Sequence, residues 1–334
     1  MKIENLEIDR FITEKYIPVI DVRSPAEYQR GHIPGSINIP LFDDEGRAKV
    51  GTVYKTAGKE KAMLTGLELA GPRLHEILSA ALQIDQKYQT GRKLRIYCWR
   101  GGKRSNSVGW LLANSGFSIK ILKGGYKAFR NFVLQQFTKK YKLKILGGYT
   151  GSGKTQILHK MRDAGKQVID LEALACHRGS AFGAMTGVPQ PTQAMFENLL
   201  ATDLLEIKPE NEVWLEDESR LIGKLSIPHE LWLQMRSVPV TFLDVSRPDR
   251  AAYLANEYKD LTNEQIIDSL NRIQKRIGGA NFKTALSALN QNDREKVAHI
   301  VLEYYDRAYD FGLQKRDNLK IQKFSQLEFS VYKS

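Results

Sequence analysis

The glycine-rich segment 148–155 restricts the fold of this chain more than any other feature of its sequence. It reads Gly-Tyr-Thr-Gly-Ser-Gly-Lys-Thr, follows an expected strand at 144–147 and precedes a helical pattern over 155–164. Glycines let backbone N–H groups approach phosphate oxygens, the lysine supplies positive charge, and the threonine hydroxyl could hold a magnesium ion. This succession predicts a phosphate-binding loop in an α/β domain, in preference to a merely tight turn. The residues assigned to phosphate binding are Gly148, Gly151, Ser152, Gly153, Lys154 and Thr155.

A loop of this kind needs an acidic partner at the end of a later strand. Glu216 and Asp217, after an apolar strand, are the candidate partners, and Glu218 follows them directly. The sequence leaves open which of these acids assists a metal ion, contacts the substrate or is only solvated. Asp170 and Glu172, at the end of another expected strand, have the same three interpretations.

Two further features of the second half also have competing interpretations. Arg247 and Arg250 follow an apolar strand and could close over phosphates or lie on the surface. Cys176 and His177 are adjacent residues of metal-ligating types, but two ligands do not make a zinc site and the sequence has no second pair. We therefore expect no site in which the protein alone holds a metal ion, and we expect His177 and Arg178 to contact a phosphate or RNA.

Expected strands and helices alternate in both halves of the chain, which predicts parallel sheets. The first half has expected strands at 16–22, 93–98 and 118–122 and expected helices at 71–82, 108–113 and 126–137. The second half adds expected strands at 144–147, 167–171, 212–216 and 240–245, and its last third has the apolar periodicity of helices. A length of 334 residues fits two domains. We place them at 1–137 and 145–334, joined by the basic linker 138–144.

Positive charge is concentrated in the first half of the chain. Residues 1–144 hold 26 Lys and Arg against 13 acids, whereas residues 145–334 hold 24 against 25. The segment 86–162 contains 18 Lys and Arg and no acid. This segment is either a solvated basic face or a field that attracts phosphate-bearing partners, including nucleic acid. The RNA-contact candidates in the linker are Lys139, Lys140 and Lys142.

Other properties of the sequence exclude several classes of protein. No apolar run approaches the roughly 20 residues of a membrane span, so we expect no integral membrane protein. The first residues lack the pattern of a signal peptide, which favours a cytoplasmic location. With only two cysteines, Cys98 and Cys176, a disulfide framework is not expected.

Cys98 stands at the carboxyl end of an expected strand, where ligands bind in open α/β sheets. The sequence Trp-Arg-Gly-Gly-Lys-Arg-Ser follows it, and then a helical pattern begins. Glycines allow a tight turn whose N–H groups point inward, and the following helix presents its positive dipole end. These surroundings predict a nucleophile in an anion-binding loop, in preference to an inert buried cysteine. The loop residues assigned to anion binding are Arg100, Gly101, Gly102, Lys103, Arg104 and Ser105.

The first half resembles rhodanese domains in three places. Segments 21–28 (DVRSPAEY) and 31–40 (GHIPGSINIP) are similar to the opening signature of that family, and 122–129 (LKGGYKAF) is similar to its closing signature. The resemblance implies that Cys98 carries sulfur as a persulfide and that Asp21 and Arg23 brace the loop.

The cysteine loop departs from the common rhodanese pattern in its length. Five residues separate Cys98 from Arg104, where common single-domain rhodaneses have four. This longer spacing also resembles dual-specificity phosphatases, which normally have histidine before the cysteine, whereas this chain has Tyr97. A phosphatase is therefore disfavoured. A wider loop suits a carrier atom larger than sulfur, or a phosphate-bearing donor.

Almost the whole chain resembles the tRNA 2-selenouridine synthase family, including the longer cysteine loop, the phosphate-binding loop and the segment 171–183. The resemblance implies a rhodanese-like domain followed by a P-loop NTPase-like α/β domain with a helical C-terminal part. It implies a transferase that replaces the sulfur of wobble 2-thiouridine in tRNA with selenium from selenophosphate, which selenophosphate synthetase could deliver. The implied intermediate is geranylated 2-thiouridine made with geranyl diphosphate, and no tightly bound cofactor is implied.

Two other functional classes stay open at the level of sequence. One is an ATP-dependent tRNA sulfurtransferase or kinase fused to a rhodanese domain, because the phosphate-binding loop could take geranyl diphosphate, ATP or both. The other is an RNA-binding regulatory protein on a rhodanese scaffold. The intact cysteine, glycines and cations of the 98–105 loop argue against the regulator.

Overall fold

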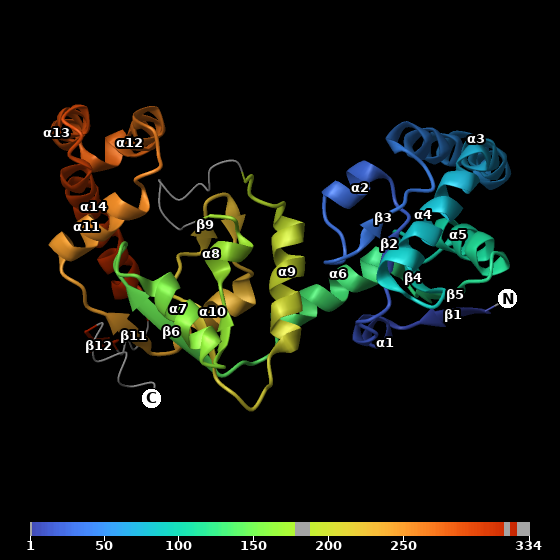
Figure 1. The fold of residues 1–334 in the computed structure, drawn as a ribbon, viewed down its shortest axis with the longest axis horizontal. Helices are drawn as coiled ribbons and strands as arrows, with labels where there is room; N and C mark the ends of the chain where they lie inside the picture. The colour runs from blue at the N-terminus through green and yellow to red at the C-terminus, as the bar shows by residue number, and fades with distance from the viewer. Residues whose placement is uncertain (1, 178–187, 317–320, 326–334) are drawn as a thin grey trace. The chain divides into compact units, whose positions relative to one another are not determined.

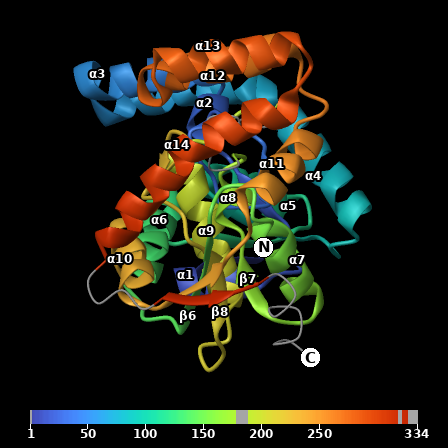
Figure 2. The ribbon, with the colours of Figure 1, turned by 90° about the vertical axis from the view of Figure 1, so that its left-hand side faces the viewer.

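The computed structural model describes residues 2–177, 188–316 and 321–325. By their contacts, the residues fall into two compact units. Unit 1 comprises Met1–Gln136 and Glu197–Thr202, and unit 2 comprises Phe137–Phe196 and Asp203–Ser334. Figure 1 shows that each unit has its own sheet, and Figure 2 shows strands β6, β7 and β8 of unit 2 from another side.

Unit 1 contains a five-stranded sheet in which every neighbouring pair is parallel. The order β1-β5-β4-β2-β3 corresponds to Lys2–Leu6, Ser118–Leu122, Lys93–Tyr97, Val19–Asp21 and Ile37–Asn38. The predicted parallel sheet is thus confirmed. Because β4 pairs with both β2 and β5, its carboxyl end lies in the middle of the sheet edge, and Cys98 follows there.

The helices of unit 1 connect these strands. They are α1 (Ile8–Thr13), α2 (Pro25–Gln29), α3 (Asp44–Ala70), α4 (Leu74–Tyr88), α5 (Lys103–Asn114) and α6 (Gly125–Gln136), with a 3-10 turn at Gly71–Arg73. Ile77 of α4 and Val108 of α5 pack with Ile96 of β4 in one buried cluster. The sequence did not predict α3, which lacks a continuous apolar stripe and is kinked at Gly58 with φ of 87°.

Unit 2 contains a second parallel sheet of five strands, in the order β12-β11-β6-β8-β7. Their bounds are Ile321–Phe324, Val240–Leu243, Leu143–Gly148, Val213–Glu216 and Gln167–Ile169. A short antiparallel pair consists of β9 (Leu221–Ile222) and β10 (Leu225–Ser226). β6 lies at the centre between β11 and β8, so the phosphate-binding loop leaves the sheet at its middle.

The helices of unit 2 include a C-terminal group with its own core (Figure 1). The helices of the described chain after β6 are α7 (Lys154–Asp163), α8 (Leu171–Leu174), α9 (Gln193–Glu206), α10 (His229–Ser237), α11 (Arg247–Glu257), α12 (Asn263–Ile277), α13 (Gly279–Asn290) and α14 (Arg294–Gln314). Ile266, Leu270 and Ile273 of α12 pack against Val297 and Val301 of α14, which confirms the predicted helical end. No helix within residues 2–177, 188–316 and 321–325 has both the length and the apolar character of a membrane span.

Candidate functional site

Cys98 directly follows β4 and is buried, with 3% of its surface exposed. Two groups of its own loop lie against the sulfur, and one of them, the Ser105 hydroxyl, donates to the Gly102 carbonyl over 3.0 Å. The Gly102 N–H donates to Sγ over 3.3 Å, and the Ser105 hydroxyl lies 3.3 Å from Sγ. Helix α5 starts at Lys103, so its first N–H groups and its positive dipole end are near the same loop. The arrangement can stabilise negative charge on the sulfur or on an atom bound to it.

Two glycines bring the closing segment against the cysteine loop. Gly101 has φ of 64°, and a Cβ there would lie 2.3 Å from the Leu122 carbonyl oxygen. Gly125 has φ of 58°, and a Cβ there would lie 2.2 Å from the Cys98 carbonyl oxygen. The same Cys98 oxygen accepts a hydrogen bond from the Tyr126 N–H over 2.8 Å. The two segments that the sequence singled out around 98–105 and 122–129 therefore form one structure in which only glycine fits at these points.

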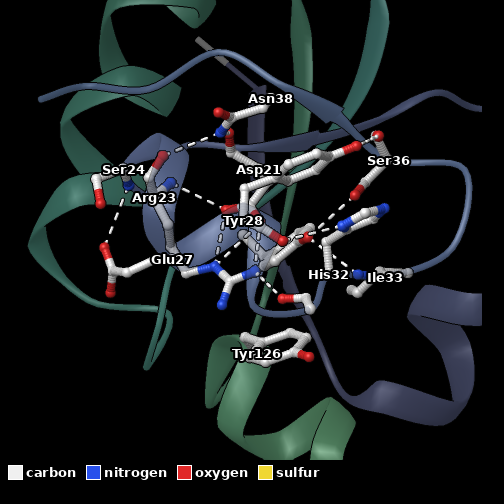
Figure 3. Close-up of polar contacts among 12 residues, drawn as sticks. Asp21, Arg23, Ser24, Glu27, Tyr28, His32, Ile33, Ser36, Asn38 and Tyr126 are labelled. Atoms are coloured by element: carbon white, nitrogen blue, oxygen red, sulfur yellow. Dashed lines mark hydrogen bonds and ion pairs between the residues drawn. The ribbon is translucent and has the colours of Figure 1, made fainter. Parts of the chain in front are cut away.

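A buried ion pair supports this structure from the opening segment (Figure 3). Arg23 donates to Asp21 over 2.6 Å and to the Gly31 carbonyl over 2.8 Å, and both charged side chains are almost fully buried. The Arg23 guanidinium carbon lies 3.9 Å from the centre of the Tyr126 ring, a cation–π distance. Arg23 thus contacts Tyr126, whose N–H donates to the Cys98 carbonyl. This contact agrees with the bracing role that the resemblance implies for Arg23.

Tyr97 occupies the position at which dual-specificity phosphatases have histidine, and its hydroxyl is engaged in contacts within unit 1. Its hydroxyl accepts from the Ile33 N–H over 3.1 Å and lies 3.0 Å from the Ser36 hydroxyl. Burial, together with the charge of Asp21, raises the pKa of Tyr97 well above its usual value. Tyr97 therefore joins the core of unit 1 to its opening segment.

The cations of the cysteine loop have different environments. Arg100 and Lys103 are exposed, whereas Arg104 is half-buried and donates to Glu27 over 2.5 and 3.2 Å. Burial opposes ionisation of Glu27, but the hydrogen bonds and charge of Arg104 outweigh it and hold the pKa of Glu27 below its ordinary value. Among the residues assigned to anion binding, Gly102 and Ser105 are those that contact the sulfur.

A turn of α9 also belongs to unit 1 and was missed by sequence reasoning. Asn198 is fully buried and donates to the Tyr126 hydroxyl over 2.9 Å and to the His32 carbonyl over 2.8 Å. Arg130 hydrogen-bonds with both Asn198 and Glu197. No motif or charge pattern marks the segment, because its role depends on which side chains it meets in space.

The phosphate-binding loop joins β6 to α7, as the sequence predicts for 148–155. Gly151 and Gly153 have φ of 81° and 76°, and Lys154 donates to the Gly148 carbonyl over 2.8 Å. The Ser152 hydroxyl is buried and has no hydrogen-bond partner among the described residues. A buried hydroxyl without a partner is costly unless a ligand atom satisfies it, so this loop fits a phosphate oxygen.

The structure separates the acids that the sequence left as alternatives. Glu216 is buried and accepts from the Thr155 hydroxyl over 3.0 Å, and Glu172 accepts from the same hydroxyl over 3.3 Å. Burial first, and then the charge of Glu172, raises the pKa of Glu216 well above its ordinary value. For Glu218, burial and then Glu172 raise the pKa to about 8. Positive charge brought to this cluster would favour the ionised acids.

Asp217 has a different role from Glu216. It accepts from the Tyr309 hydroxyl over 2.7 Å and forms a buried ion pair with Arg316. The same Tyr309 hydroxyl accepts from the Gly148 N–H over 3.2 Å. Asp217 therefore supports the first residue of the loop through Tyr309, and Glu216 is the acid beside Thr155.

The other candidate site residues of the second half either contact neighbouring protein groups or lie outside the residues that the structure describes. Arg250 is buried and paired with Asp306 over 2.8 Å, so the surface role that the sequence allowed for it is wrong. Arg247 also contacts Asp306, over 3.2 Å. Burial lowers the pKa of His177, whereas Arg178 and the rest of 178–187 lie outside the described residues.

The three linker lysines proposed for RNA are exposed. Lys142 donates to the Glu210 carbonyl over 2.9 Å, a contact that leaves its charge unneutralised. Leu143 already belongs to β6, so the strand begins before the expected linker ends. Contact between tRNA and Lys139, Lys140 and Lys142 stays a prediction.

Comparisons with known proteins place both sites within recognised families. Residues 6–132 match the rhodanese-like domain, and residues 141–332 match the tRNA 2-selenouridine synthase AAA domain. The tRNA 2-selenouridine synthase of Bdellovibrio bacteriovorus is 35% identical to this chain, and the similarity extends over 98% of each of the two proteins. That of Nitrosomonas eutropha is 34% identical over 90% of this chain and 89% of its own. That of Shewanella halifaxensis is 36% identical over 92% of this chain and 91% of its own.

Proposed function

Since this chain belongs to the family of tRNA 2-selenouridine synthases, we propose that it replaces the sulfur of wobble 2-thiouridine in tRNA with selenium. We further propose that selenophosphate supplies the selenium and that geranyl diphosphate activates the sulfur. A cytoplasmic location, where tRNA is modified, belongs to the same proposal. The observation that carries it is the presence in one chain of a cysteine held by anion-binding groups and a phosphate-binding loop with an unsatisfied hydroxyl.

The first step would be alkylation of the 2-thiouridine sulfur. The sulfur attacks carbon 1 of geranyl diphosphate, a carbon–sulfur bond forms, and diphosphate leaves with the electron pair of the broken carbon–oxygen bond. The base loses its N3 proton to solvent, so the alkylated base is neutral. Loop N–H groups and Lys154 would stabilise the charge that develops on the leaving diphosphate. Thr155 and Glu216, which already contact each other, would hold a magnesium ion if one accompanies the diphosphate.

The second step would exchange sulfur for selenium at carbon 2 of the base. A thiocarbonyl sulfur is a poor leaving group, and geranylation makes it a better one. The selenium of selenophosphate adds to carbon 2, and the geranylthiolate departs with the electron pair of the broken carbon–sulfur bond. Water then cleaves the phosphorus–selenium bond, which leaves selenium on the base and releases phosphate. The Cys98 loop supports this step because the Gly102 N–H donates to the sulfur and the positive end of α5 lies near it, surroundings suited to an anionic selenium species.

Cys98→Ala tests the selenium step. We expect it to abolish 2-selenouridine in tRNA, measured by mass spectrometry of nucleosides from cells grown with selenium, while circular dichroism remains that of the folded protein. Cys176→Ala is the matched control, because Cys176 lies in unit 2 outside the cysteine loop, and it should retain selenation. Normal selenation by Cys98→Ala would exclude Cys98 from the reaction.

Lys154→Ala tests the prenyl step separately. We expect loss of both geranylated and selenated tRNA, because the diphosphate would lose the lysine charge. Supplying tRNA that already carries geranylated 2-thiouridine should restore part of the selenation. If that tRNA is not selenated, the phosphate-binding loop acts in the selenium step. ATP turnover stimulated by tRNA would instead favour an ATP-driven transferase.

A further inference from the structure

Helix α14 contacts the first residues of the phosphate-binding loop, although 161 positions separate the contacting residues in the sequence. The Tyr309 hydroxyl accepts from the Gly148 N–H over 3.2 Å, and the hydroxyl of Tyr149 donates to Asp310 over 2.8 Å. The rings of Tyr149 and Tyr309 also meet edge to face, with their centres 5.6 Å apart. Two successive residues of the loop are therefore held by two successive residues of one helix.

The third residue of the loop is attached to the same helix through an arginine. Arg250 donates to the Thr150 carbonyl over 3.1 Å and forms a buried ion pair with Asp306 of α14 over 2.8 Å. Asp306 lies three and four positions before the two residues of α14 that hold Gly148 and Tyr149, so all three supports come from one face of the helix. The start of the loop is thus fastened to α14 at every residue from 148 to 150.

The Tyr309 hydroxyl is itself oriented by a partner. It donates to Asp217 over 2.7 Å, and Asp217 is paired with the buried Arg316. A carboxylate can only accept, so the hydroxyl gives its proton to Asp217 and keeps a lone pair for the Gly148 N–H. The absence of a side chain at Gly147 permits this approach, because a Cβ there would lie 2.8 Å from the Tyr309 oxygen.

Support of this kind matters for a loop that is rich in glycine. Glycine loses more conformational freedom than any other residue when it is ordered, and Gly148, Gly151 and Gly153 all belong to the loop. Phosphate binding requires several loop N–H groups to point at one place. A loop that is already held in that arrangement loses less freedom on binding than a loose one, and it binds more tightly for that reason.

We propose that Tyr309 is a positioning residue of the phosphate-binding loop, and that α14 sets the affinity of the loop for phosphate groups through it. The proposal goes beyond the proposed function, because it holds for any ligand whose phosphate or diphosphate lies in this loop. It makes the last long helix of the chain a part of the phosphate site, which the glycine pattern of 148–155 does not indicate.

Calorimetric titration of the full chain with inorganic diphosphate tests this role. Tyr309→Phe keeps the ring and removes the hydroxyl, so the buried Gly148 N–H loses its acceptor, and we expect diphosphate binding to weaken about tenfold. Tyr304→Phe is the matched control, the same change on the same helix, because the Tyr304 hydroxyl accepts from Arg276 of α12 over 3.3 Å. It should leave the affinity unchanged, and circular dichroism should show both variants folded.

Two further measurements separate positioning from general stabilisation. Asp217 orients the Tyr309 hydroxyl, so Asp217→Asn should weaken diphosphate binding in the wild type and hardly further in Tyr309→Phe. Diphosphate should also slow hydrogen exchange of the α14 amides in the wild type, and do so less in Tyr309→Phe, because coupling between loop and helix is reciprocal. The exchange measurement stands alone if Asp217→Asn does not fold.

The outcomes distinguish this proposal from the proposed function. Unchanged diphosphate affinity in folded Tyr309→Phe would overturn it, even if the melting temperature falls, because the hydroxyl would then serve stability alone. Additive effects of Tyr309→Phe and Asp217→Asn would overturn it as well. If Lys154→Ala weakens diphosphate and Tyr309→Phe does not, only the positioning role fails. If Lys154→Ala does not weaken diphosphate, the phosphate role of the loop fails, and with it the prenyl step of the proposed function.

Discussion

Arg104 is one of the three cations that follow Cys98, yet its guanidinium is already engaged by Glu27. Glu27 also accepts from the Ser24 N–H at the start of α2, over 3.2 Å. The ion pair therefore connects the cysteine loop to the opening segment, and it neutralises charge that the sequence assigns to anion binding. At the scale of single residues, the groups that reach the sulfur are uncharged. They are the Gly102 N–H, which donates to it, and the Ser105 hydroxyl, which donates to the Gly102 carbonyl.

The lowered pKa of Glu27 predicts a pH-dependent contribution to stability. Glu27→Gln should reduce the free energy of unfolding of unit 1 by about 1–3 kcal/mol at pH 7, because Arg104 loses its charged partner. A carboxyl whose pKa is depressed below 4.5 stabilises the fold above that pH, and the contribution is lost as pH falls through the folded-state pKa. Urea unfolding from pH 7 to pH 3 should therefore show the two proteins converging. Glu60→Gln, at an exposed site on α3, should change stability by less than about 0.5 kcal/mol.

At the scale of elements, the surroundings of Cys98 depend on the contact between two turns. β4 ends at the Cys98 loop and β5 ends at the segment that leads into α6. These strands pair in parallel, so their carboxyl ends lie side by side and the two turns must pack closely. One of the two closest approaches is at Gly101, where there is no room for a side chain.

Gly101→Ala should separate the two turns. The left-handed φ and the approach of 2.3 Å to the Leu122 oxygen together should cost about 2–6 kcal/mol of stability. Selenation should be lost with the loop geometry. Gly116→Ala is the matched control, since Gly116 has φ of 89° but nothing within 4 Å of an added Cβ. Thermal unfolding and nucleoside mass spectrometry should show the control losing about 1 kcal/mol and remaining active. Equal effects of the two substitutions would contradict the contact.

At the scale of the whole molecule, charge is distributed unevenly along the chain. The acid-free segment 86–162 contains the cysteine loop of unit 1 and the phosphate-binding loop of unit 2. Between these loops in the sequence, Lys139, Lys140 and Lys142 are exposed and can attract a polyanion. The exposed Lys123 and Lys144 are paired with Glu7 and Glu212. Each phosphate that a lysine neutralises releases counterions, so affinity for tRNA should fall steeply with salt.

Replacing Lys139, Lys140 and Lys142 with Gln should weaken tRNA binding. The slope of log affinity against log salt should decrease in magnitude by about one to three units, if each lysine touches about one phosphate. The matched control replaces three exposed lysines outside the acid-free segment, Lys259, Lys283 and Lys296, with the same loss of charge. Filter binding at several salt concentrations distinguishes the two variants. An unchanged slope in the first would mean that the linker lysines are only solvated.

Much of this architecture is determined by local sequence. Glycine spacing with strand and helix periodicity predicted the turn between β6 and α7, and the same kind of pattern predicted the loop after β4. The local sequence did not predict α3, β1 and β12. The apolar periodicity of α3 is weak, and β1 and β12 are short edge strands. The parallel pairing of neighbouring strands in both five-stranded sheets was predicted from the alternation of strands and helices, whereas the order of the strands was not.

The roles of individual charged residues were decided only in the tertiary structure. The sequence presents Glu216, Asp217 and Glu218 as equivalent neighbours, but in the fold Glu216 contacts Thr155 and Asp217 contacts Tyr309, 92 residues away. The sequence presents Arg250 as a phosphate contact or a surface residue, and only the fold shows its ion pair with Asp306. Sequence by itself determined where phosphate and thiol chemistry can occur, because backbone turns depend on local residues. Which acid or cation serves each site depended on distant partners, because an ion pair forms wherever folding brings opposite charges together.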